Sequence, residues 1–474
     1  MHPLRNITTD LEQTVIRNGF CIGCGTCAAI TSSPFSIAFN DIGQYEARTS
    51  AQSDRADPLV RDTATKVCPF SNSAADEDEI ADDLFSELGY RHSDGLGYFQ
   101  SIYAGYVVQD GFREKGSSGG FGSWILNELL ETKSVDHVIH VRPFKSSDRG
   151  HPLFTYQVSN SPQEIALGGK SRYYPVELSE ALKQVREKPG RYAIVGLPCF
   201  IKGVRLLQRQ DPLIKERIRF CIGLVCGHLK SSGYAESLAW QAGIPPNELR
   251  HIDFRVKGNE GRANRYYTLA TSEREERIIP TKELKGTDWG AGTFKYKACD
   301  FCDDVFAETA DLVLGDAWLP QFIHDPQGTN VLVVRNQLVN SMLCSAASKG
   351  RIKINPLSDA EALKSQDAGL RHRRESLGYR LHIEQTAGRW SPSKRVQASP
   401  NMIPRHERHR QQMRIRMREI SHSSFQEAKR VGDVSVYLDT FSALYDEYKK
   451  IKPGILVKLR LQVKKLMLKL AGRA

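Results

Sequence analysis

The sequence predicts an α/β fold with a mixed sheet, and three observations lead to this prediction. Short strand-like runs alternate with helical runs between about residues 100 and 345. Before this region the chain is polar and punctuated by cysteines, and after about residue 350 it becomes helical and rich in Arg, His and Gln. We therefore expect a small N-terminal module at 1–75, an acidic linker at 76–99, an α/β domain at 100–345 and a basic, mostly helical extension at 346–474.

The elements of the α/β domain are predicted from residue type and spacing. Strands are expected where β-branched residues are bounded by Gly, Pro or Asp, at Ile102–Val108, His137–Val141, Tyr192–Val195, Ile218–Val225, Asp311–Leu314 and Asn330–Val334. Helices are expected at Phe121–Glu131, Glu177–Arg186, Ile201–Gln208 and Ser231–Ala242. Because strands alternate with helices, the sheet should contain parallel strands.

Composition places the chain among globular cytoplasmic proteins. Of its 474 residues, 40% are hydrophobic and 26% are charged. No apolar stretch approaches the roughly 18 residues of a membrane-spanning helix, and Met1–Asp10 contains no apolar signal region. We therefore expect neither an integral membrane protein nor a secreted one.

The net charge of +11 is concentrated near the C-terminus. Residues 401–474 hold 17 Lys and Arg against 7 Asp and Glu, so the first 400 residues are close to neutral. Within this region, Ile455–Leu470 has apolar residues at helical spacing and lysines on its other faces, which predicts a basic amphipathic helix.

Three interpretations of the helix at 455–470 stay open. It could attach the protein to an anionic surface at the inner face of a membrane, which would suit a lipid-linked substrate. It could instead pack on the protein body with its lysines in solvent. Nucleic-acid binding is disfavoured, because the nearby Arg405–Arg418 cluster lacks interleaved aromatics and no docking motif is present.

Two further segments are interpreted without assigning chemistry to them. We interpret the acidic run from Asp76 to Glu87 as a solvated linker or an exposed helix face. Helical stretches are expected between Arg371 and Glu419, with Ser391–Pro404 as a linker between them.

Three cysteines at successive two-residue gaps form the sharpest motif of the chain. Cys21-Ile-Gly-Cys24-Gly-Thr-Cys27 is the kind of tight loop from which ferredoxin-like modules bind a 4Fe–4S cluster. Thr31 stands where a fourth cysteine often follows, but Cys68-Pro69 repeats the expected Cys-Pro ending. We predict that Cys21, Cys24, Cys27 and Cys68 bind one 4Fe–4S cluster. The alternative is a zinc site, although zinc ribbons rarely space three cysteines in this way.

A second set of cysteines is dispersed along the α/β domain. Cys199 and Cys226 each follow a strand-like run, and Cys299-x2-Cys302 is a recognisable half-site. Loops at one edge of a sheet can converge, so these four thiols could complete a second tetrahedral site, although structural cysteines could also explain Cys199 and Cys226. The remaining two, Cys221 and Cys344, are interpreted as buried small hydrophobes.

Five motifs in order resemble one known family. They are Gly116-Ser-Ser-Gly-Gly-Phe-Gly122, Gly196-Leu-Pro-Cys199, Cys226-Gly-His228, Cys299-x2-Cys302 and Ala310-Asp-Leu-Val-Leu-Gly-Asp-Ala-Trp318. Together they resemble the β subunits of coenzyme F420 hydrogenases and dehydrogenases over about residues 15 to 340. The family often has Cys-His-Gly where this chain has Cys226-Gly-His228, which puts the role of that histidine in doubt. Nothing in the family accounts for the region after about residue 350.

The resemblance implies an iron–sulfur flavoprotein with FAD in the α/β domain and two 4Fe–4S clusters, the second held by Cys199, Cys226, Cys299 and Cys302. It implies a ferredoxin or a reduced deazaflavin as electron donor and a small-molecule or lipid-linked substrate. Relatives of the family include ferredoxin-dependent reductases of chlorophyll-type substrates, and others lie beside bacterial polysaccharide-assembly genes.

Two glycine-containing turns are the predicted FAD contacts. In the first turn, Ser117–Gly120, backbone N–H groups and the start of the following helix could approach a diphosphate. The second turn, Gly169–Arg172, adds the positive charges of Lys170 and Arg172 for the phosphates. The predicted contacts are Ser117, Ser118, Gly119, Gly120, Gly169, Lys170, Ser171 and Arg172. No catalytic acid or base is assigned: Asp316, His228 and Lys170 each have an alternative as a cap, a supporting partner or a phosphate contact.

Three functions compete at this point. The leading one is an oxidoreductase that uses its clusters to pass single electrons and its flavin to exchange a hydride with the substrate. The second is an electron-transfer subunit without a substrate site of its own. The third is a zinc-stabilised interaction protein, which would be colourless, whereas clusters and flavin absorb visible light.

Overall fold

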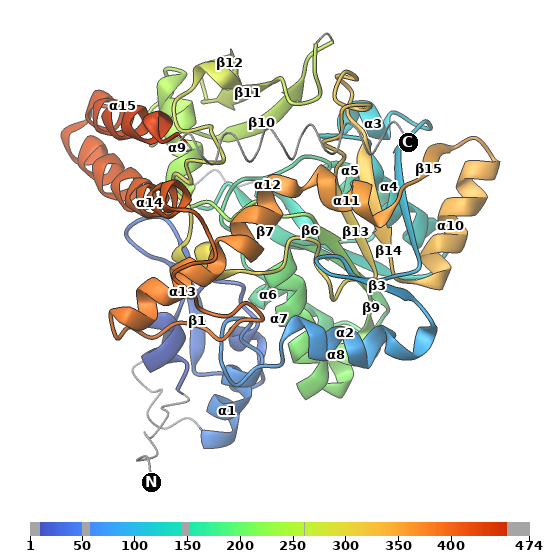
Figure 1. Cartoon of the computed structure of the whole chain (residues 1–474). Coiled ribbons are helices and arrows are strands. Elements are labelled where there is room, and N and C mark those ends of the chain that lie inside the picture. The colour runs from blue at the N-terminus through green and yellow to red at the C-terminus, as the bar shows by residue number, and fades with distance from the viewer. Residues whose placement is uncertain (1–9, 50–56, 145–150, 260, 453–474) are drawn as a thin grey trace, which may run out of the picture.

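An eight-stranded mixed sheet forms the centre of the molecule in the computed structural model (Figure 1). The structure describes residues 10–49, 57–144, 151–259 and 261–452. The predicted mixed α/β domain is confirmed. Among the described residues, no helix is long and apolar enough to cross a membrane.

Four parallel strands occupy the middle of the sheet, and antiparallel strands flank them on both sides. The order across the sheet is β15-β5-β14-β13-β9-β8-β6-β7. The strands are β5 (Ser101–Val107), β6 (His137–Pro143), β7 (Phe154–Ser159), β8 (Tyr192–Gly196), β9 (Ile218–Leu224), β13 (Leu312–Asp316), β14 (Asn330–Val334) and β15 (Ile352–Pro356). All six predicted strands are present. Strand β15, which was not predicted, is an edge strand of alternating character, Ile-Lys-Ile-Asn-Pro, with a weak apolar signal.

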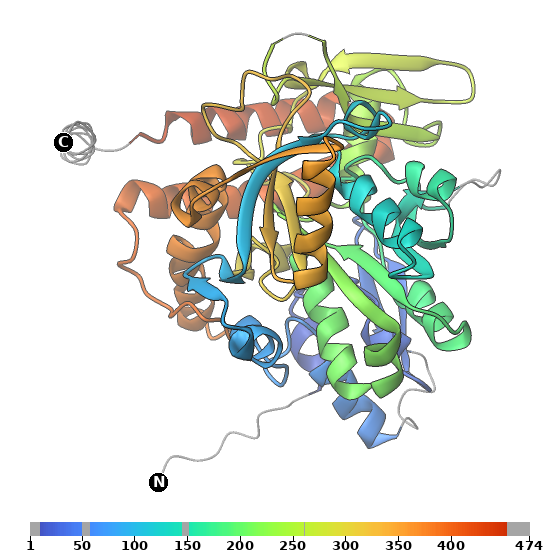
Figure 2. The same ribbon diagram turned by 90° about the vertical axis from the view of Figure 1, so that its right-hand side faces the viewer.

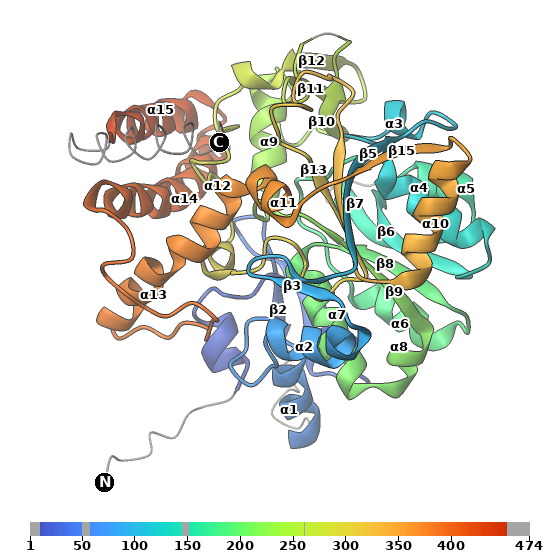
Figure 3. The same cartoon turned by 45° about the vertical axis from the view of Figure 1, so that its right-hand side comes forward.

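Helices cover both faces of this sheet. Neighbouring residues of one strand point to opposite faces, as with Leu312 and Val313, which belong to different hydrophobic clusters. One face packs against α4 (Phe121–Glu131), α5 (Pro162–Ala166) and α10 (Gln337–Ser348), which lie together on one side in Figure 3. The other face packs against α6 (Ser179–Glu187), α7 (Pro198–Gln210) and α8 (Pro212–Arg217). All four predicted helices are present, the last of them as α9 (Ser232–Gln241).

The N-terminal segment packs against the α6–α7 side of the sheet. It contains η1 (Glu12–Ile16), η2 (Cys27–Ala29), a hairpin of β1 (Phe35–Phe39) and β2 (Tyr45–Thr49), and α1 (Pro58–Lys66). Its buried residues share one core with α6 and α7. The resemblance of this segment to a ferredoxin stays a prediction.

Residues 76–99 are folded and do not form a free linker. They contain α2 (Glu77–Phe85), η4 (Ser86–Leu88) and the hairpin of β3 (Arg91–Ser93) and β4 (Gly97–Phe99). Asp76 begins α2 with a capping box, and Ile80, Ala81 and Phe85 are buried. Glu77 is also buried and forms an ion pair with Lys202 at 3.1 Å. The acidic run therefore forms a helix with one packed face, and Asp78, Glu79, Asp82 and Asp83 lie exposed on it, as the exposed-helix alternative predicted; only Glu77 departs from it.

A second sheet of three antiparallel strands was not predicted. Its strands are β10 (His251–Lys257), β11 (Tyr266–Thr271) and β12 (Glu276–Pro280), followed by η5 (Thr281–Glu283) and η6 (Lys297–Phe301). Strand β12 is mostly exposed, so its sequence carries little apolar signal. Figure 2 shows this sheet at the top of the molecule and the N-terminal elements at the bottom, with α3 (Phe112–Lys115) near the top.

The described residues after β15 are mostly helical, whereas β15 itself, inside the predicted extension, belongs to the central sheet. The residues after β15 contain α11 (Asp359–Ser365), α12 (Asp367–Leu370), η7 (Arg371–Glu375), α13 (Leu377–Thr386), α14 (Arg405–Val431) and α15 (Ser435–Lys450). Helices α14 and α15 pair with each other and pack near α9, where Phe425 contacts Trp240. The predicted basic amphipathic helix at 455–470 lies outside the described residues.

Many basic residues of this region lie against acidic residues of the rest of the chain. Arg418 contacts Asp300 at 2.6 Å, and Arg395 contacts Glu308 at 2.7 Å and Asp78 at 2.6 Å. Segment 391–404 has no regular secondary structure, but Arg395 within it is almost fully buried. Part of the positive charge that the sequence concentrates after residue 370 is therefore neutralised by the protein body.

Candidate functional site

The structure brings the four cysteines of the first predicted set around one cavity. Cys21, Cys24, Cys27 and Cys68 all line the same cavity. The first three lie on the loop that leads into η2, and the fourth follows α1. The Thr26 hydroxyl donates a hydrogen bond to the carbonyl oxygen of Val67 at 3.2 Å, which joins the two segments across 41 residues.

Two glycines allow this cysteine loop to bend against its neighbours. Gly23 and Gly25 have φ of +63° and +88°, a region that side chains disfavour. A Cβ at Gly23 would lie 2.4 Å from the Cβ of Tyr45, and one at Gly25 would lie 2.6 Å from the backbone nitrogen of Ser179. Both the backbone conformation and the close packing therefore require glycine at these positions.

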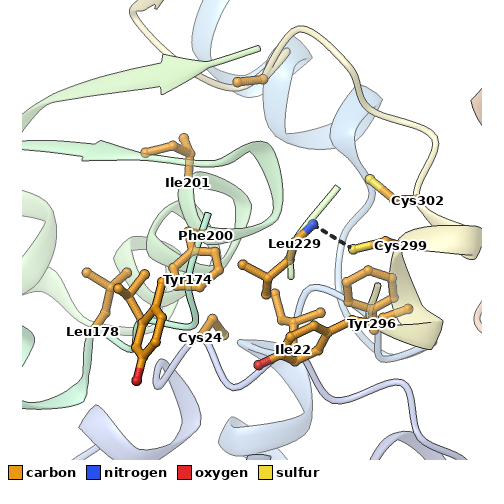
Figure 4. Packing of buried hydrophobic residues seen from close by; sticks show 14 of the residues in the cluster. Ile22, Cys24, Tyr174, Leu178, Phe200, Ile201, Leu229, Tyr296, Cys299 and Cys302 are labelled. Carbon is orange, nitrogen blue, oxygen red and sulfur yellow. Dashed lines mark hydrogen bonds between the residues drawn. The ribbon is translucent and has the colours of Figure 1, made fainter. Parts of the chain in front are cut away.

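The second predicted set also surrounds one cavity. Cys199, Cys226, Cys299 and Cys302 line one cavity (Figure 4 labels Cys299 and Cys302). Cys199 lies in the first turn of α7, directly after the carboxyl end of β8, and Cys226 follows the adjacent parallel strand β9. Cys299 lies within η6, and Cys302 follows it. Neighbouring parallel strands end at one edge of a sheet, which is why residues far apart in sequence meet here.

The two cavities adjoin each other. Ile22 and Phe70 line both of them. Figure 4 shows Ile22 and Tyr296 between Cys24 on one side and Cys299 on the other. The Tyr296 hydroxyl accepts a hydrogen bond from the backbone N–H of Tyr45 at 2.8 Å, which ties η6 to the N-terminal hairpin. One layer of side chains thus separates the two cysteine sets.

A single metal ion and a 4Fe–4S cluster make different demands on their ligands. A cluster offers each thiolate a different iron, so its ligands surround a larger body than the ligands of one zinc ion do. In the part of the chain that the structure describes, no three His, Cys, Asp or Glu side chains are placed to hold a metal ion. The group that each cysteine set binds stays a prediction.

Burial also shapes the chemistry of these thiols. It raises the pKa of Cys21 to about 11 and that of Cys299 to about 12, since a thiolate is poorly solvated there. Metal ligands must be deprotonated, so a bound cation would have to offset this cost. Such thiols are suited to bind a cationic centre and poorly suited to act as free nucleophiles.

The two glycine-containing turns also meet in the structure. The backbone N–H of Ser171 donates a hydrogen bond to the Ser117 hydroxyl at 2.9 Å, although 54 residues separate them. Ser118 is buried, and Gly120 directly precedes α4. A Cβ at Gly119 would lie 2.7 Å from the carbonyl oxygen of Gly105, so packing against the sheet already requires glycine there. The flavin contacts of this first turn stay a prediction.

Cationic side chains gather beside the second turn, which contains Gly169. Lys170 Nζ lies 3.4 Å from Asp253 Oδ2, and Lys257 Nζ donates to the Ser118 carbonyl oxygen at 2.8 Å. Burial lowers the pKa of Lys257 to about 7. Arg172 lies over the Phe154 ring, and its Nε and Nη1 are buried without a hydrogen-bond partner among the described residues. Guanidinium donors left open in this way fit an anionic group such as a diphosphate.

Strand β10 supplies residues to this region that the sequence analysis missed. Asp253 and Lys257 contact the predicted turns, and Arg255 forms an ion pair with both carboxylate oxygens of Asp316, at 2.8 and 3.2 Å. The signal was present in His251-Ile-Asp-Phe-Arg-Val-Lys257, where charged and apolar residues alternate. Such alternation is typical of a strand with one charged face, here a face turned toward other protein groups.

The three residues considered as acids or bases have different surroundings. Lys170 and Asp316 are held in the ion pairs just described. The His228 ring lies 4.4 Å from the Trp289 ring, and its buried Nε2 has no partner among the described residues. Burial and nearby cations lower the His228 pKa well below its usual value, so this side chain is neutral near pH 7.

The two cysteines outside both sets, Cys221 and Cys344, differ in burial. Cys221 is fully buried in β9, as predicted. Cys344 is exposed, because α10 packs through Val339, Leu343 and Ala346 and turns Cys344 to the outside. The prediction that Cys344 is buried was therefore wrong.

Comparisons with known families cover this same region. Residues 102–183 match the N-terminal part, and residues 190–360 the C-terminal part, of the family described as "Coenzyme F420 hydrogenase/dehydrogenase, beta subunit". Together the two matches cover more than half of the 474 residues. The chain belongs to this family. The matched region includes the second cysteine set and both glycine-containing turns, and it ends before α12.

Individual relatives of this member of the F420 hydrogenase/dehydrogenase family are distant. A coenzyme F420-dependent sulfite reductase of Methanocaldococcus jannaschii is 22% identical over 368 residues, which are 74% of this chain and 50% of the relative. The chain thus spans about half the length of that relative. An F(420)H(2) dehydrogenase component of Methanosarcina mazei is 21% identical over 334 residues, or 68% of this chain and 81% of the relative.

Among solved structures, a chain of the F420-reducing NiFe hydrogenase complex from Methanosarcina barkeri is similar, with a TM-score of 0.48 and 15% sequence identity. The similarity covers 64% of this chain and 98% of that chain.

Proposed function

We propose that this protein is an iron–sulfur flavoprotein oxidoreductase that passes electrons between a ferredoxin or a deazaflavin and a substrate. Two 4Fe–4S clusters would be held by the first and second cysteine sets, and FAD by the two glycine-containing turns. The observation that carries the proposal is the pair of adjoining cavities, each lined by four cysteines. Membership of the F420 hydrogenase/dehydrogenase family supports the same reaction class.

The N-terminal cysteine set would receive single electrons from the donor. Two cysteines of the first set, Cys21 and Cys68, are partly exposed, against Cys199 alone in the second set, so the first set is the more exposed of the two. When bound, the clusters supply one-electron transfer and FAD supplies hydride exchange. Ile22 and Phe70 are apolar and line both cavities, so they would exclude water between two bound clusters.

The chain's own residues would bind and orient the flavin. Arg172 offers two open guanidinium nitrogens to a phosphate, and Lys257 holds the first turn through the Ser118 carbonyl. Arg255 fixes Asp316 by a two-point ion pair. The most specific part of the proposal concerns the substrate, which would be a small or lipid-linked molecule, including one from polysaccharide assembly. Substrate screening tests this part.

Anaerobic purification followed by quantification of iron, sulfide and flavin tests the proposal. We expect about eight irons and one FAD per chain, with visible absorption of both groups. Cys226→Ser should lower the iron content by about half, whereas Cys344→Ser, at the exposed cysteine outside both sets, should leave it unchanged. A colourless protein that contains zinc would exclude the redox function.

An electron-transfer subunit without a substrate site is the second candidate. The family description and the name of the Methanosarcina mazei relative both denote subunits. The isolated chain, supplied with an artificial one-electron donor, distinguishes the two candidates. Turnover of a substrate by the chain alone supports the enzyme, whereas cluster reduction without turnover in a broad screen supports the electron-transfer role.

A further inference from the structure

Arg373 reaches the second cysteine cavity from outside the region that the family match covers. The match ends at residue 360, and Arg373 lies in η7. Its Nη1 lies 3.0 Å from Cys302 Sγ, and its Nη2 lies 3.5 Å from Cys226 Sγ. The side chain lines the cavity, and the residue is 2% exposed. One buried cation thus contacts two of the four thiols.

Two backbone carbonyls hold this guanidinium in place. Nη1 donates to the Asp304 carbonyl oxygen and Nη2 to the Gly227 carbonyl oxygen, each at 2.6 Å. The planar fork of arginine can satisfy two carbonyls and still direct N–H groups at two sulfurs, which the single ammonium of lysine cannot do. The position of the charge is therefore set by the surrounding backbone.

Other charges around the second set come close to balancing each other. Asp303 and Asp304 follow Cys302 directly, and Glu77 and Glu308 lie close to them. Lys394 and Arg395 neutralise Asp303, while Arg395 and Arg374 pair with Glu308. Among the described residues, the cation that the structure places in hydrogen-bond contact with these sulfurs is Arg373.

The first set has a different electrostatic environment. Its sulfurs receive neutral hydrogen bonds, from the backbone N–H groups of Gly23 and Ala47 to Cys21 Sγ, and they have the Thr26 hydroxyl near Cys24 Sγ. Glu177 lies beside this cysteine loop, since a Cβ at Gly25 would be 2.7 Å from its Oε2, while Glu46 is paired with Arg48 at 3.8 Å. The four thiols of this set have no cation in contact with sulfur among the described residues.

We propose that Arg373 raises the reduction potential of the second centre above that of the first, so that electrons run from the first cysteine set to the second. Reduction adds a negative charge, which a contacting guanidinium stabilises and neighbouring carboxylates oppose. The inference rests on the proposed function, because it requires a cluster at each set. Arg373 would thus act on the direction of electron transfer through the reduction potential of the second centre.

The electron balance is simple. A one-electron donor of the ferredoxin class is oxidised by one electron, which reaches the first centre. That electron then moves to the second centre, so the first returns to its oxidised state and can accept again. No proton or covalent bond is involved in this step, and two such transfers supply the two electrons of one flavin reduction.

An anaerobic redox titration of the wild-type protein, followed by electron paramagnetic resonance, provides the first test. We expect two midpoint potentials. In Arg373→Met the higher of them should fall by at least about 59 mV, a tenfold change in the ratio of reduced to oxidised centre, and the lower one should stay unchanged. Arg371→Met is the matched control, since Arg371 is exposed two residues away and pairs with Asp367; neither potential should move.

Each outcome bears on one proposal. If only the lower potential falls in Arg373→Met, or if neither moves although both clusters are present, the inference is wrong. If the wild-type protein lacks either cluster, the proposed function itself fails and takes the inference with it. If Arg373→Met does not fold, Arg373→Lys still tests the idea, because it keeps the charge and loses the two-point contact: we expect a smaller fall of the same potential.

Discussion

Arg172 has two guanidinium nitrogens, Nε and Nη1, that are buried without a hydrogen-bond partner among the described residues. A buried donor without a partner costs about 1–3 kcal/mol, and a bound anion that accepts from these nitrogens would remove that cost. The neighbouring Lys170 is already paired with Asp253. Arg172 is therefore the residue of the second turn that is best placed to bind a phosphate of FAD.

Substituting Arg172 by glutamine should weaken FAD binding by about tenfold or more, because one charge-assisted hydrogen bond is lost. The measurement is the dissociation constant of FAD for deflavinated protein, from the quenching of flavin fluorescence. Arg219→Gln, at an exposed position of β9, is the control and should bind FAD as the wild type does. An unchanged affinity in Arg172→Gln would remove this residue from the flavin site.

His140 makes stability depend on pH. Burial lowers its pKa to about 4, and its Nε2 lies 2.7 Å from the Ser159 hydroxyl. In the unfolded chain its pKa returns to about 6.5, so the unfolded state binds a proton that the folded state excludes. Stability is therefore lost as pH falls from about 7 toward 4, by at most about 3 kcal/mol for this side chain.

His140→Gln should make this loss shallower, as measured by urea unfolding at pH 7, 6 and 5. His92→Gln, on the exposed strand β3, is the control and should keep the wild-type slope. Equal slopes in all three proteins would mean that His140 does not contribute to the acid sensitivity.

At the scale of elements, buried ion pairs hold the C-terminal region to the rest of the chain. Arg395, in the segment between α13 and α14, contacts Asp303 at 3.3 Å and Glu308 at 2.7 Å, and its side chain is 7% exposed. Arg418 of α14 similarly contacts Asp300 beside the second cysteine set. The C-terminal region is thus part of the wall around that set.

Arg395→Met should lower the free energy of unfolding by about 3–5 kcal/mol, because it leaves buried carboxylates without a cation. Chemical denaturation followed by circular dichroism measures this. Arg430→Met removes an exposed pair with Glu427 on α14 and should change stability little. Comparable effects of the two variants would show that the buried network adds no special stability.

At the scale of the whole molecule, the second cysteine set joins three parts of the chain. Cys199 belongs to α7, Cys226 follows β9, and Cys299 and Cys302 lie at η6, while Arg373 closes the cavity from η7. The first set lies on the N-terminal segment, and it adjoins the second set because Ile22 and Phe70 line both cavities. Bound clusters would therefore link segments that are distant in sequence.

Removing the clusters should lower the melting temperature of the whole chain by several degrees, since a ligand that binds only the folded state stabilises it. Anaerobic calorimetry before and after treatment with an iron chelator measures the change. Reconstitution with iron and sulfide should restore the original value. A melting temperature that does not depend on iron content would contradict a structural role for the clusters.

Much of the architecture was predictable because its signal is local. The six β-branched runs and the helix Phe121–Glu131 are buried on repeating faces, so periodicity in sequence reports them directly. The Cys21–Cys27 loop and Cys68 could also be grouped from spacing, and the structure places them around one cavity. Exposed or polar elements such as β12 and the face of α2 that binds Lys202 carried no such signal.

The α/β class, the family resemblance and the Cys21–Cys27 loop could be predicted from the residues alone, because these depend on residue type and short-range spacing, whereas spacing left the second cysteine set open. Only the tertiary structure decided that the two cavities adjoin, that β10 lies beside the glycine-containing turns, and that Arg373 contacts two thiols. The contacts of Lys257 with Ser118 and of Arg373 with Cys226 join residues 139 and 147 positions apart. Packing of whole elements sets them, and no local pattern in one sequence records that packing.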